Sequence, residues 1–354
     1  MRDGKTDVHT ANKAALAPLR IAMRDFEAEG VRSALDEALA PGAPCRMAHP
    51  LGTPEGADAL YGTCHAPLLA AMPDLERRDW IVMAGRDDHG HDWVGFGGHW
   101  MGTFVAPFLG IPPTGHLAHM RFHEFYRFEE GRVAEVQALW DLPELMMQAD
   151  AWPMAPSLGR EFCIPGPASC DGVVPGPWDE PRAEAVKARI VDMLTHMKRH
   201  PSEGGPEVME MERFWHPRMN WYGPAGIGTG RGIAGFRNWH QIPFLNGMPD
   251  RGRYVDEITY HFFGDGDYAA VTGWPNMVQT VTDDGWLGIP PSGQRITMRS
   301  LDFWRIEDGL IRENWVMVDL LDAYHQLGVD VLARMREFNK ARVPGTVPFP
   351  VGTA

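Results

Sequence analysis

The sequence contains few cysteines, no long apolar run and no excess of basic residues. Its four cysteines, Cys45, Cys64, Cys163 and Cys170, show no paired metal-ligand spacing, so we expect four free thiols. The first 25 residues hold no apolar stretch long enough for a signal peptide or a membrane span, which predicts a cytoplasmic protein without a membrane partner. Acidic residues outnumber basic ones by 47 to 33, and the net charge of −14 disfavours nucleic acid as a partner.

An internal repeat is the clearest feature of the chain. Gly-Ile-Pro-Pro-Thr-Gly at residues 110–115 returns as Gly-Ile-Pro-Pro-Ser-Gly at residues 288–293, and this offset of 178 continues without a gap for 39 residue pairs. Fifteen of the 39 pairs are identical, where ordinary residue frequencies would give roughly two or three. Upstream, the offset is 176 and aligns Met-Pro-Asp at 72–74 with Met-Pro-Asp at 248–250. Repeats of this length indicate two copies of one unit.

The repeat predicts two tandem domains of about 150 residues each, a usual domain size. A stretch rich in Pro and Gly separates them and is typical of a linker packed on the surface. The expected divisions are a first copy at 1–152, a linker at 153–182, a second copy at 183–340 and a tail at 341–354.

Each unit begins with helical patterns and continues with strand patterns. Apolar spacing predicts opening helices at 11–39 and 184–197, and shorter helical segments at 56–72 and 232–248. In the first copy, segments rich in aromatic or β-branched residues and separated by turns predict strands at 80–84, 93–104, 118–128 and 132–140. Helices followed by a meander of strands indicate an α+β fold.

This order, with Met-Pro-Asp, the Gly-Ile-Pro-Pro turn, a strand ending in Arg127 or Arg305, a Glu/Asp-Gly turn and a closing Gln148 or Gln326, resembles the SnoaL-like polyketide cyclase family. The resemblance implies the fold of nuclear transport factor 2 in both copies. In that fold a strongly bent antiparallel sheet wraps around helices and forms a cone with an internal pocket. The resemblance also implies a small hydrophobic organic ligand, no cofactor and no bound metal. It does not specify a reaction, because one fold hosts many functions.

Two acids on the strand after the Pro-Pro turn are candidates for proton transfer. Period-two alternation places Glu124 on one face with Phe122, Tyr126 and Phe128, and it places Asp302 on the matching face of the second copy with Trp304. If this face lines a pocket, desolvation raises the acids' pKa and suits them to acid/base catalysis near neutral pH. The alternative is that each carboxylate pairs with an arginine and has a structural role.

The last strand departs from the family pattern. The catalytic Asp of the family aligns with Ala138 and Val316, neither of which can transfer a proton. Asp141 and Asp319 match a second family acid three residues later, where an acid can equally cap the next helix. Asn314 shares the face of Val316 and could orient a carbonyl, so the second copy has the better equipped pocket.

Aromatic and histidine residues near the expected pocket mouths are candidate ligand contacts, with core packing as the alternative. These residues are His49, His65, His99, Trp100 and Tyr126 in the first copy, and Trp221, Tyr222, Trp239, His240 and Trp304 in the second.

Other histidine and glycine patterns do not indicate a site. His116 and His119 point to opposite faces of a strand, which argues against zinc. His89 and His91 lie in an Asp/Gly turn that we expect to be solvated. The glycine-rich stretch at 226–235 follows no predicted strand, which argues against a nucleotide loop.

Two functions remain open from the sequence. One is a cofactor-independent cyclase, isomerase or hydrolase for a hydrophobic carbonyl compound, in which Asp302 or Glu124 moves a proton. The other is a non-catalytic binding or scaffolding protein, suggested by the missing family Asp. We also expect the two copies to pack as an intramolecular pseudo-dimer, and assembly into a homo-oligomer stays open.

Overall fold

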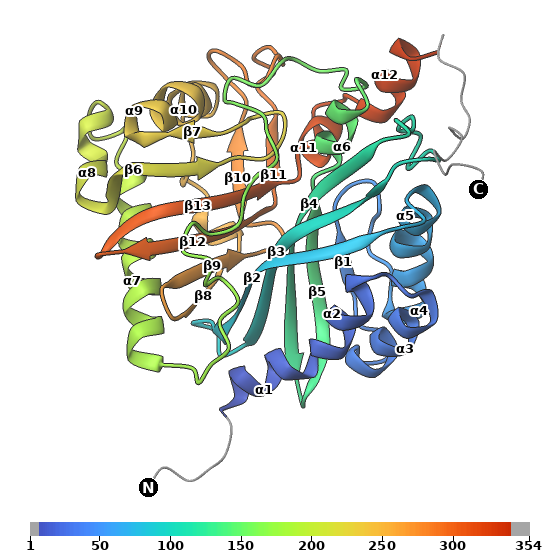
Figure 1. Cartoon of the computed structure of the whole chain (residues 1–354). Helices are drawn as coiled ribbons and strands as arrows, with labels where there is room; N and C mark the ends of the chain where they lie inside the picture. The colour runs from blue at the N-terminus through green and yellow to red at the C-terminus, as the bar shows by residue number, and fades with distance from the viewer. Residues whose placement is uncertain (1–6, 341–354) are drawn as a thin grey trace, which may run out of the picture.

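The computed structural model describes residues 7–340 and folds them into two similar halves, each a mixed sheet with helices on one face (Figure 1). The sheets lie together in the middle of the molecule, and the helices flank them on the outside. This arrangement is the α+β architecture that the repeat predicts.

The first half precedes the linker and contains six α-helices and five strands among the described residues. Its helices are α1 (Val8–Ala15), α2 (Ala17–Arg24), α3 (Ala28–Ala38), α4 (Gly56–Leu60), α5 (Ala66–Ala71) and α6 (Leu142–Gln148), with a π-helical turn at Tyr61–His65. Its strands are β1 (Cys45–Met47), β2 (Glu76–Arg86), β3 (Asp92–Thr103), β4 (Leu117–Glu129) and β5 (Arg132–Trp140), in the sheet order β1-β5-β4-β3-β2.

The second half repeats this order, and its strands β8, β9 and β12 are shorter than their counterparts β2, β3 and β4. Its helices are α7 (Glu180–Met197), α8 (Met211–Phe214), α9 (Gly232–Phe236), α10 (Ile242–Gly247), α11 (Leu320–Gln326) and α12 (Val331–Phe338), with a π-helical turn at Arg237–Gln241 and 3₁₀ turns at Pro206–Met209 and Val255–Glu257. Its strands are β6 (Trp215–Tyr222), β7 (Gly230–Arg231), β8 (His261–Asp265), β9 (Tyr268–Thr272), β10 (Met277–Thr280), β11 (Arg295–Met298), β12 (Ser300–Glu307) and β13 (Leu310–Val318). Six of these strands form a sheet in the order β7-β6-β13-β12-β9-β8, and β10 pairs with β11.

The repeated turns have the same backbone in both halves. Leu109 and Gly110 have φ values of 53° and 82°, and Leu287 and Gly288 have 47° and 83°. Two successive residues with positive φ are the signature of a two-residue type I′ turn, in which a glycine at the second position avoids backbone strain. The Gly-Ile-Pro-Pro motif is therefore the second half of a tight turn that both copies need.

One strand pair in each of the two large sheets corrects the expectation of antiparallel sheets. β1 runs parallel to β5, and β6 runs parallel to β13, whereas the other paired strands of these sheets are antiparallel. Helices lie along the chain between the members of each parallel pair, and such crossovers are what parallel pairing requires.

The halves pack through the sheet faces that point away from their helices. Phe125 and Phe303, which the repeat places at equivalent positions, stack on each other with ring centroids 5.0 Å apart. Arg121 is fully buried and donates hydrogen bonds to the carbonyl oxygens of Gly223 (2.7 Å) and Val316 (3.2 Å) in the other half. Equivalent residues meet across an approximate two-fold axis, as in a symmetric dimer.

The linker region packs along the interface between the two halves, which is called the seam below. Val82 of β2 donates its backbone N–H to Gly172 and accepts one from Val174, so the linker extends the β2 edge. The indole N–H of Trp315 donates to Pro165. Among residues 7–340, no helix combines the length and the apolar character that crossing a membrane requires.

Candidate functional site

The interior of the first half is filled by an arginine. Arg77 of β2 lies with its guanidinium 4.1 Å from the ring centroid of Phe122 and donates to Glu124 Oε2 at 2.7 Å. Glu124 also accepts hydrogen bonds from the Tyr126 hydroxyl (2.8 Å) and the Trp140 indole (2.9 Å). All four side chains are buried. Glu124 is thus held in a buried ion pair, the structural alternative that the sequence left open.

The other candidates of the first half lie in its core or at the seam. His65 packs against Trp100 inside the half, and burial lowers the pKa of His65 to about 4. His99 points to the opposite face of β3, where it accepts a hydrogen bond from the Trp80 indole. His49 stacks on His325 of the other half. The Tyr126 hydroxyl donates its hydrogen bond to Glu124. The ligand-contact candidates of the first half therefore do not converge on a single site.

The second half is open where the first is filled. After Asp74 the first half continues almost directly into β2, which carries Arg77. After Asp250 the second half forms a loop at residues 251–260 before the much shorter strand β8 begins at His261. The missing strand residues leave a gap beside α7 and β12. The aligned Arg253 is exposed and therefore does not occupy the interior position that Arg77 fills in the first half.

A cavity with two chambers occupies this gap. The outer chamber, about 440 Å³, lies between α7, the 251–260 loop, β10 and β12, and the inner chamber, about 80 Å³, lies deeper between α7, β6, α9, α10 and β13. An outer chamber of this size is in the range of small-molecule sites. Residues that line both chambers mark their junction, and they are Leu194, Arg251, Met277, Ser300, Asp302 and Trp304.

Asp302 is the acid at this junction. Burial raises the pKa of Asp302 to about 7, although the hydrogen bond from the Ser300 hydroxyl (2.6 Å) and the positive charge of Arg251 both lower it. A carboxyl group with a pKa near neutrality is able both to take up and to release a proton at physiological pH. Strand β12 places it there because its inward positions alternate as Ser300, Asp302 and Trp304.

A neutral histidine faces the inner chamber. His240 stacks on Trp221 with ring centroids 4.0 Å apart and an interplanar angle of 12°, and burial lowers the pKa of His240 to about 3. The imidazole is therefore uncharged at physiological pH and offers one N–H donor and one nitrogen acceptor. Trp221 and His240 together form a flat aromatic wall.

Buried polar atoms without partners surround the inner chamber. Within residues 7–340, neither the amide nitrogen nor the amide oxygen of Gln241 has a hydrogen-bond partner, and the indole N–H groups of Trp215 and Trp304 have none either. An unpaired buried polar group costs about 1–3 kcal/mol, so such groups are rare in cores. Four such atoms face the inner chamber, and a polar ligand group placed there would supply their missing partners.

The remaining candidates of the second half are divided between the chamber and its surroundings. Asn314 lines the inner chamber and donates from its amide to the Phe303 carbonyl oxygen. Tyr222 follows Trp221 on the strand and therefore points to the seam, where its hydroxyl donates to Glu313. Trp239 is 51% exposed and lines a separate shallow cleft on the surface.

Asp141 and Asp319 act as helix caps at the seam. Asp141 accepts from the Glu144 backbone N–H at the start of α6 and from the Ala225 backbone N–H (3.0 Å) in the other half. Asp319 caps α11 and accepts from the backbone N–H of His49 (3.0 Å) in the first half. Burial raises the pKa of Asp319 to about 6. Neither acid lines the two-chamber cavity.

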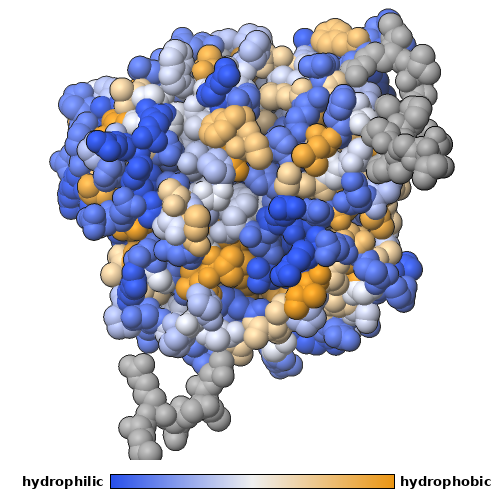
Figure 2. Space-filling view, viewed as in Figure 1, coloured by the Kyte–Doolittle hydropathy of each residue, from blue (hydrophilic) through white to orange (hydrophobic). Residues whose placement is uncertain are grey.

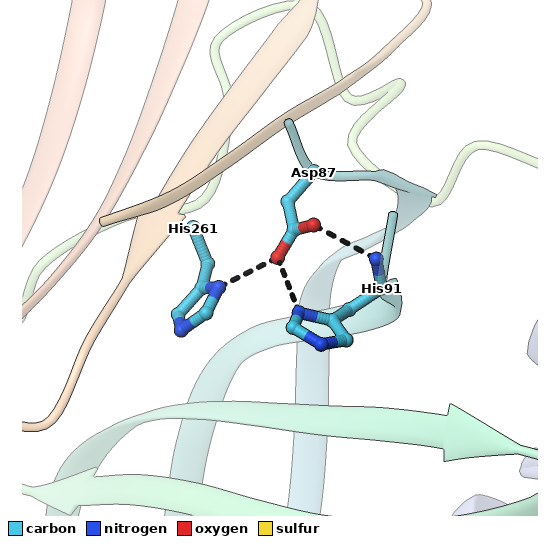
Figure 3. Close-up of side chains that lie close together, drawn as sticks. All are labelled: Asp87, His91 and His261. Carbon is cyan, nitrogen blue, oxygen red and sulfur yellow. Dashed lines mark hydrogen bonds and ion pairs between the residues drawn. The ribbon is translucent and has the colours of Figure 1, made fainter. Parts of the chain in front are cut away.

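The turn of His89 and His91 is solvent-exposed at Asp88, His89 and Gly90, as expected, and Asp87 at its start contacts His261 of the other half (Figure 3). Asp87 is buried and its Oδ2 atom lies 2.6 Å from His261 Nδ1 and 3.2 Å from His91 Nδ1. The Trp93 indole donates to the same oxygen (3.0 Å), so burial alone would raise the pKa of Asp87 but these donors hold it below its usual range. Sequence reasoning missed this because His261 belongs to the other half.

A family model for the SnoaL-like polyketide cyclase matches residues 19–149 and again residues 207–327. The chain belongs to this family. Both matches of the SnoaL-like model lie within the halves described above, and together they span most of the chain.

Solved structures of smaller proteins each align with a part of the chain about the size of one half. A SnoaL-like protein from Jannaschia sp. CCS1 is 23% identical and covers 41% of this chain and 95% of its own, with a TM-score of 0.35. IdmH from Streptomyces antibioticus is 23% identical and covers 39% and 98%, with a TM-score of 0.33. TsrD from Streptomyces laurentii is 29% identical and covers 40% and 96%, with a TM-score of 0.31. No curated protein matches the chain.

Val316 and Ala138 are the residues that the resemblance aligns with the family's catalytic Asp. Val316 lines the inner chamber as an apolar residue, and Ala138 is buried in the first half. Sequence reasoning missed Arg251 and Gln241. The signal for Gln241 was present, because the repeat aligns it with His65. The signal for Arg251 was absent, because it lies in the loop where the copies differ.

Proposed function

We propose that this SnoaL-like protein is a cofactor-independent enzyme that moves protons on a small hydrophobic carbonyl compound bound in the second half. The observation that carries the proposal is Asp302, an acid of near-neutral pKa at the junction of two chambers. Cyclisation, isomerisation and hydrolysis of such compounds can all proceed through proton transfer without a metal.

Asp302 would act first as the general base. Its carboxylate takes the proton from the carbon next to the ligand carbonyl, and the electron pair of that C–H bond moves to form an enolate. Neutral donors facing the inner chamber, His240 and Gln241, would hydrogen-bond the enolate oxygen. The protonated Asp302 then returns the proton to carbon or to an oxygen.

The alternative is a binding protein without catalysis. Val316 favours it, because the family's catalytic Asp is absent from a chamber that could still hold a ligand. Binding alone would use the same aromatic wall and unpaired polar atoms.

Replacement of Asp302 by Asn tests the proposal. Ligands are first found by the rise in melting temperature with aromatic and polyketide-like carbonyl compounds, and NMR then follows deuterium uptake at the α-carbon of a bound compound. We expect Asp302→Asn to slow this exchange about 100- to 10,000-fold, the usual contribution of a general base. In the wild type, the rate should rise with pH and level off above about 7, where Asp302 is ionised.

Asp308→Asn is the matched control. This variant makes the same substitution of Asn for Asp on the same hairpin. Asp308 lies in an exposed turn and has a φ of 51°, a conformation that Asn tolerates. Unchanged exchange in Asp302→Asn would overturn the catalytic assignment. Binding with no exchange in the wild type would establish the binding protein.

A further inference from the structure

The outer chamber carries an excess of positive charge in a protein whose net charge is −14. Arg251 lines both chambers, and Lys198 at the end of α7 lies at the rim of the outer one. Among residues 7–340, neither side chain has an ion-pair partner. The acids that line the outer chamber are Asp88 and Asp302, and Asp88 is paired with Lys187 at 2.6 Å.

Asp302 does not neutralise Arg251. Its carboxyl accepts from the Ser300 hydroxyl, and no hydrogen bond or ion pair joins it to the guanidinium in the described part of the chain. Burial lowers the pKa of Arg251, which still stays protonated because an arginine does not lose its proton in proteins. A half-buried guanidinium without a partner is costly unless a ligand supplies one.

The backbone holds Arg251 at this position. The side chain of Asp250 accepts the backbone N–H of Thr280 at 2.9 Å, which ties the start of the loop to β10. The Arg251 guanidinium lies 5.8 Å from the ring centroid of Phe244. Gly252 has a φ of 81°, and a Cβ atom there would come within 3.2 Å of Lys198 Cγ, so glycine lets the lysine stem lie against the loop.

The chamber also has apolar walls suited to a flat molecule. Tyr254, Tyr260 and Phe262 line it, and the Lys198 ammonium lies 5.9 Å from the Tyr260 ring centroid. A ligand would place an apolar body between these rings and a charged group on the guanidinium. Arginine binds carboxylates in a bidentate geometry, which favours a carboxylate over a point charge.

We propose that the outer chamber recognises the carboxylate of an aromatic acid through Arg251, with Lys198 attracting it at the rim. The inference rests on the proposed function, in that the same ligand would extend past Asp302 into the inner chamber. The substrate class is then a carbonyl compound that carries a carboxylate.

Two isosteric probes test this subsite. Binding of 2-naphthoate and of its neutral analogue 2-naphthamide to the full chain is measured by calorimetry. We expect the wild type to prefer the naphthoate at least about tenfold, and Arg251→Gln to weaken naphthoate binding about 10- to 100-fold, the usual loss for a hydrogen bond to a charged group. Naphthamide binding should change less than about threefold, and Lys198→Gln should have a smaller effect than Arg251→Gln.

Arg253→Gln is the matched control, because Arg253 is exposed, lies on the same loop and does not line the chambers. We expect it to bind both probes as the wild type does. Three results would each overturn the subsite. They are equal affinity of the wild type for the two probes, failure of both probes to bind, and a loss of naphthoate affinity in Arg253→Gln as large as that in Arg251→Gln.

The same probes separate this proposal from the catalytic one. Naphthoate selectivity that survives in Asp302→Asn, together with normal α-carbon exchange in that variant, would keep the subsite and remove the catalytic role of Asp302. Slow exchange in Asp302→Asn with no selectivity for naphthoate would do the reverse.

Discussion

Equivalent residues of the two halves have opposite surroundings. Glu124 and Asp302 occupy the same position of the repeat, yet Glu124 accepts three hydrogen bonds from buried side chains and Asp302 faces a cavity. The difference comes from a single aligned position earlier in the chain. Arg77 enters the interior of its half, whereas Arg253 stays outside. A strand position alone therefore does not determine the role of its acid.

Gln241→Leu gives a prediction at this scale. Leucine has a similar size and removes an amide whose two polar atoms lack partners in the described residues. We expect the ligand-free protein to gain about 1–2 kcal/mol of unfolding free energy, part of the usual cost of a buried unpaired group. Ligand affinity should fall at least about tenfold. Urea denaturation and calorimetry measure the two effects.

A loss of stability in Gln241→Leu would show that the amide has a structural partner. Asn246→Leu, on the exposed end of α10, is a suitable control for the added apolar surface. It should change neither quantity by more than about 0.5 kcal/mol, the usual range for surface substitutions.

Which of these residues the sequence could indicate depends on whether the repeat reaches them. Asp302 and His240 lie in segments that correspond between the copies, and alternation along the strand predicted the face of Asp302. Arg251 lies where the offset between the copies changes, so no pattern placed it. Trp239 and His240 both lie within the π-helical turn Arg237–Gln241, where Trp239 is exposed and His240 lines the inner chamber.

At the scale of elements, one strand of the second half is replaced in part by a loop. β2 has 11 residues and β8 has 5. The helices, the Pro-Pro turns and the strand order could be predicted, because local spacing and turn residues determine them. The parallel strand pairs could not be predicted, since β1 has only three residues and its pairing depends on a distant partner.

Opposite stability effects are expected for the two matched strand variants. Glu124→Gln breaks a buried ion pair with Arg77 and should lower the unfolding free energy by about 3–5 kcal/mol. Asp302→Asn removes an acid whose folded pKa, about 7, lies above its ordinary value of 3.8. The folded state then binds more protons than the unfolded state between these values, so wild-type stability falls as pH rises from about 4 to 7.

The stability of Asp302→Asn should not show this fall with pH. Its unfolding free energy should exceed that of the wild type by about 1–3 kcal/mol at pH 8 and differ little from it at pH 4. Urea denaturation at both pH values checks it. A destabilised Asp302→Asn at pH 8 would mean that the carboxylate has a partner that holds it in place.

At the scale of the whole molecule, the two halves share one interface and the surface is mostly polar. Figure 2 shows hydrophilic residues over much of one face, with apolar residues in small groups. The exposed large apolar side chains of the described residues are spread along the chain, from Val8 to Phe338. The buried apolar residues at the seam include Phe125, Phe303 and Trp315.

We predict that the halves form one compact particle and unfold together. Arg121→Met removes a buried guanidinium that donates to three carbonyl oxygens of the other half, those of Tyr222, Gly223 and Val316, and to the carboxylate of Asp141. We expect a loss of about 3–5 kcal/mol in urea denaturation. Arg132→Met, at an exposed hairpin end, should lose less than about 0.5 kcal/mol.

Small-angle scattering provides an independent measurement. A single compact shape is expected for the wild type, and two loosely linked lobes would contradict the packing of the halves. A wild type that unfolds in two separate transitions would contradict their cooperativity.

The two acids at the seam, Asp141 and Asp319, reach across it to main-chain N–H groups, those of Ala225 and His49. Every residue except proline carries such a group. The contact therefore places almost no demand on which amino acid occupies positions 49 and 225. After a duplication, the residues at these two positions can change while the hydrogen bonds between the copies remain. One copy can then fill its interior while the other keeps an open chamber.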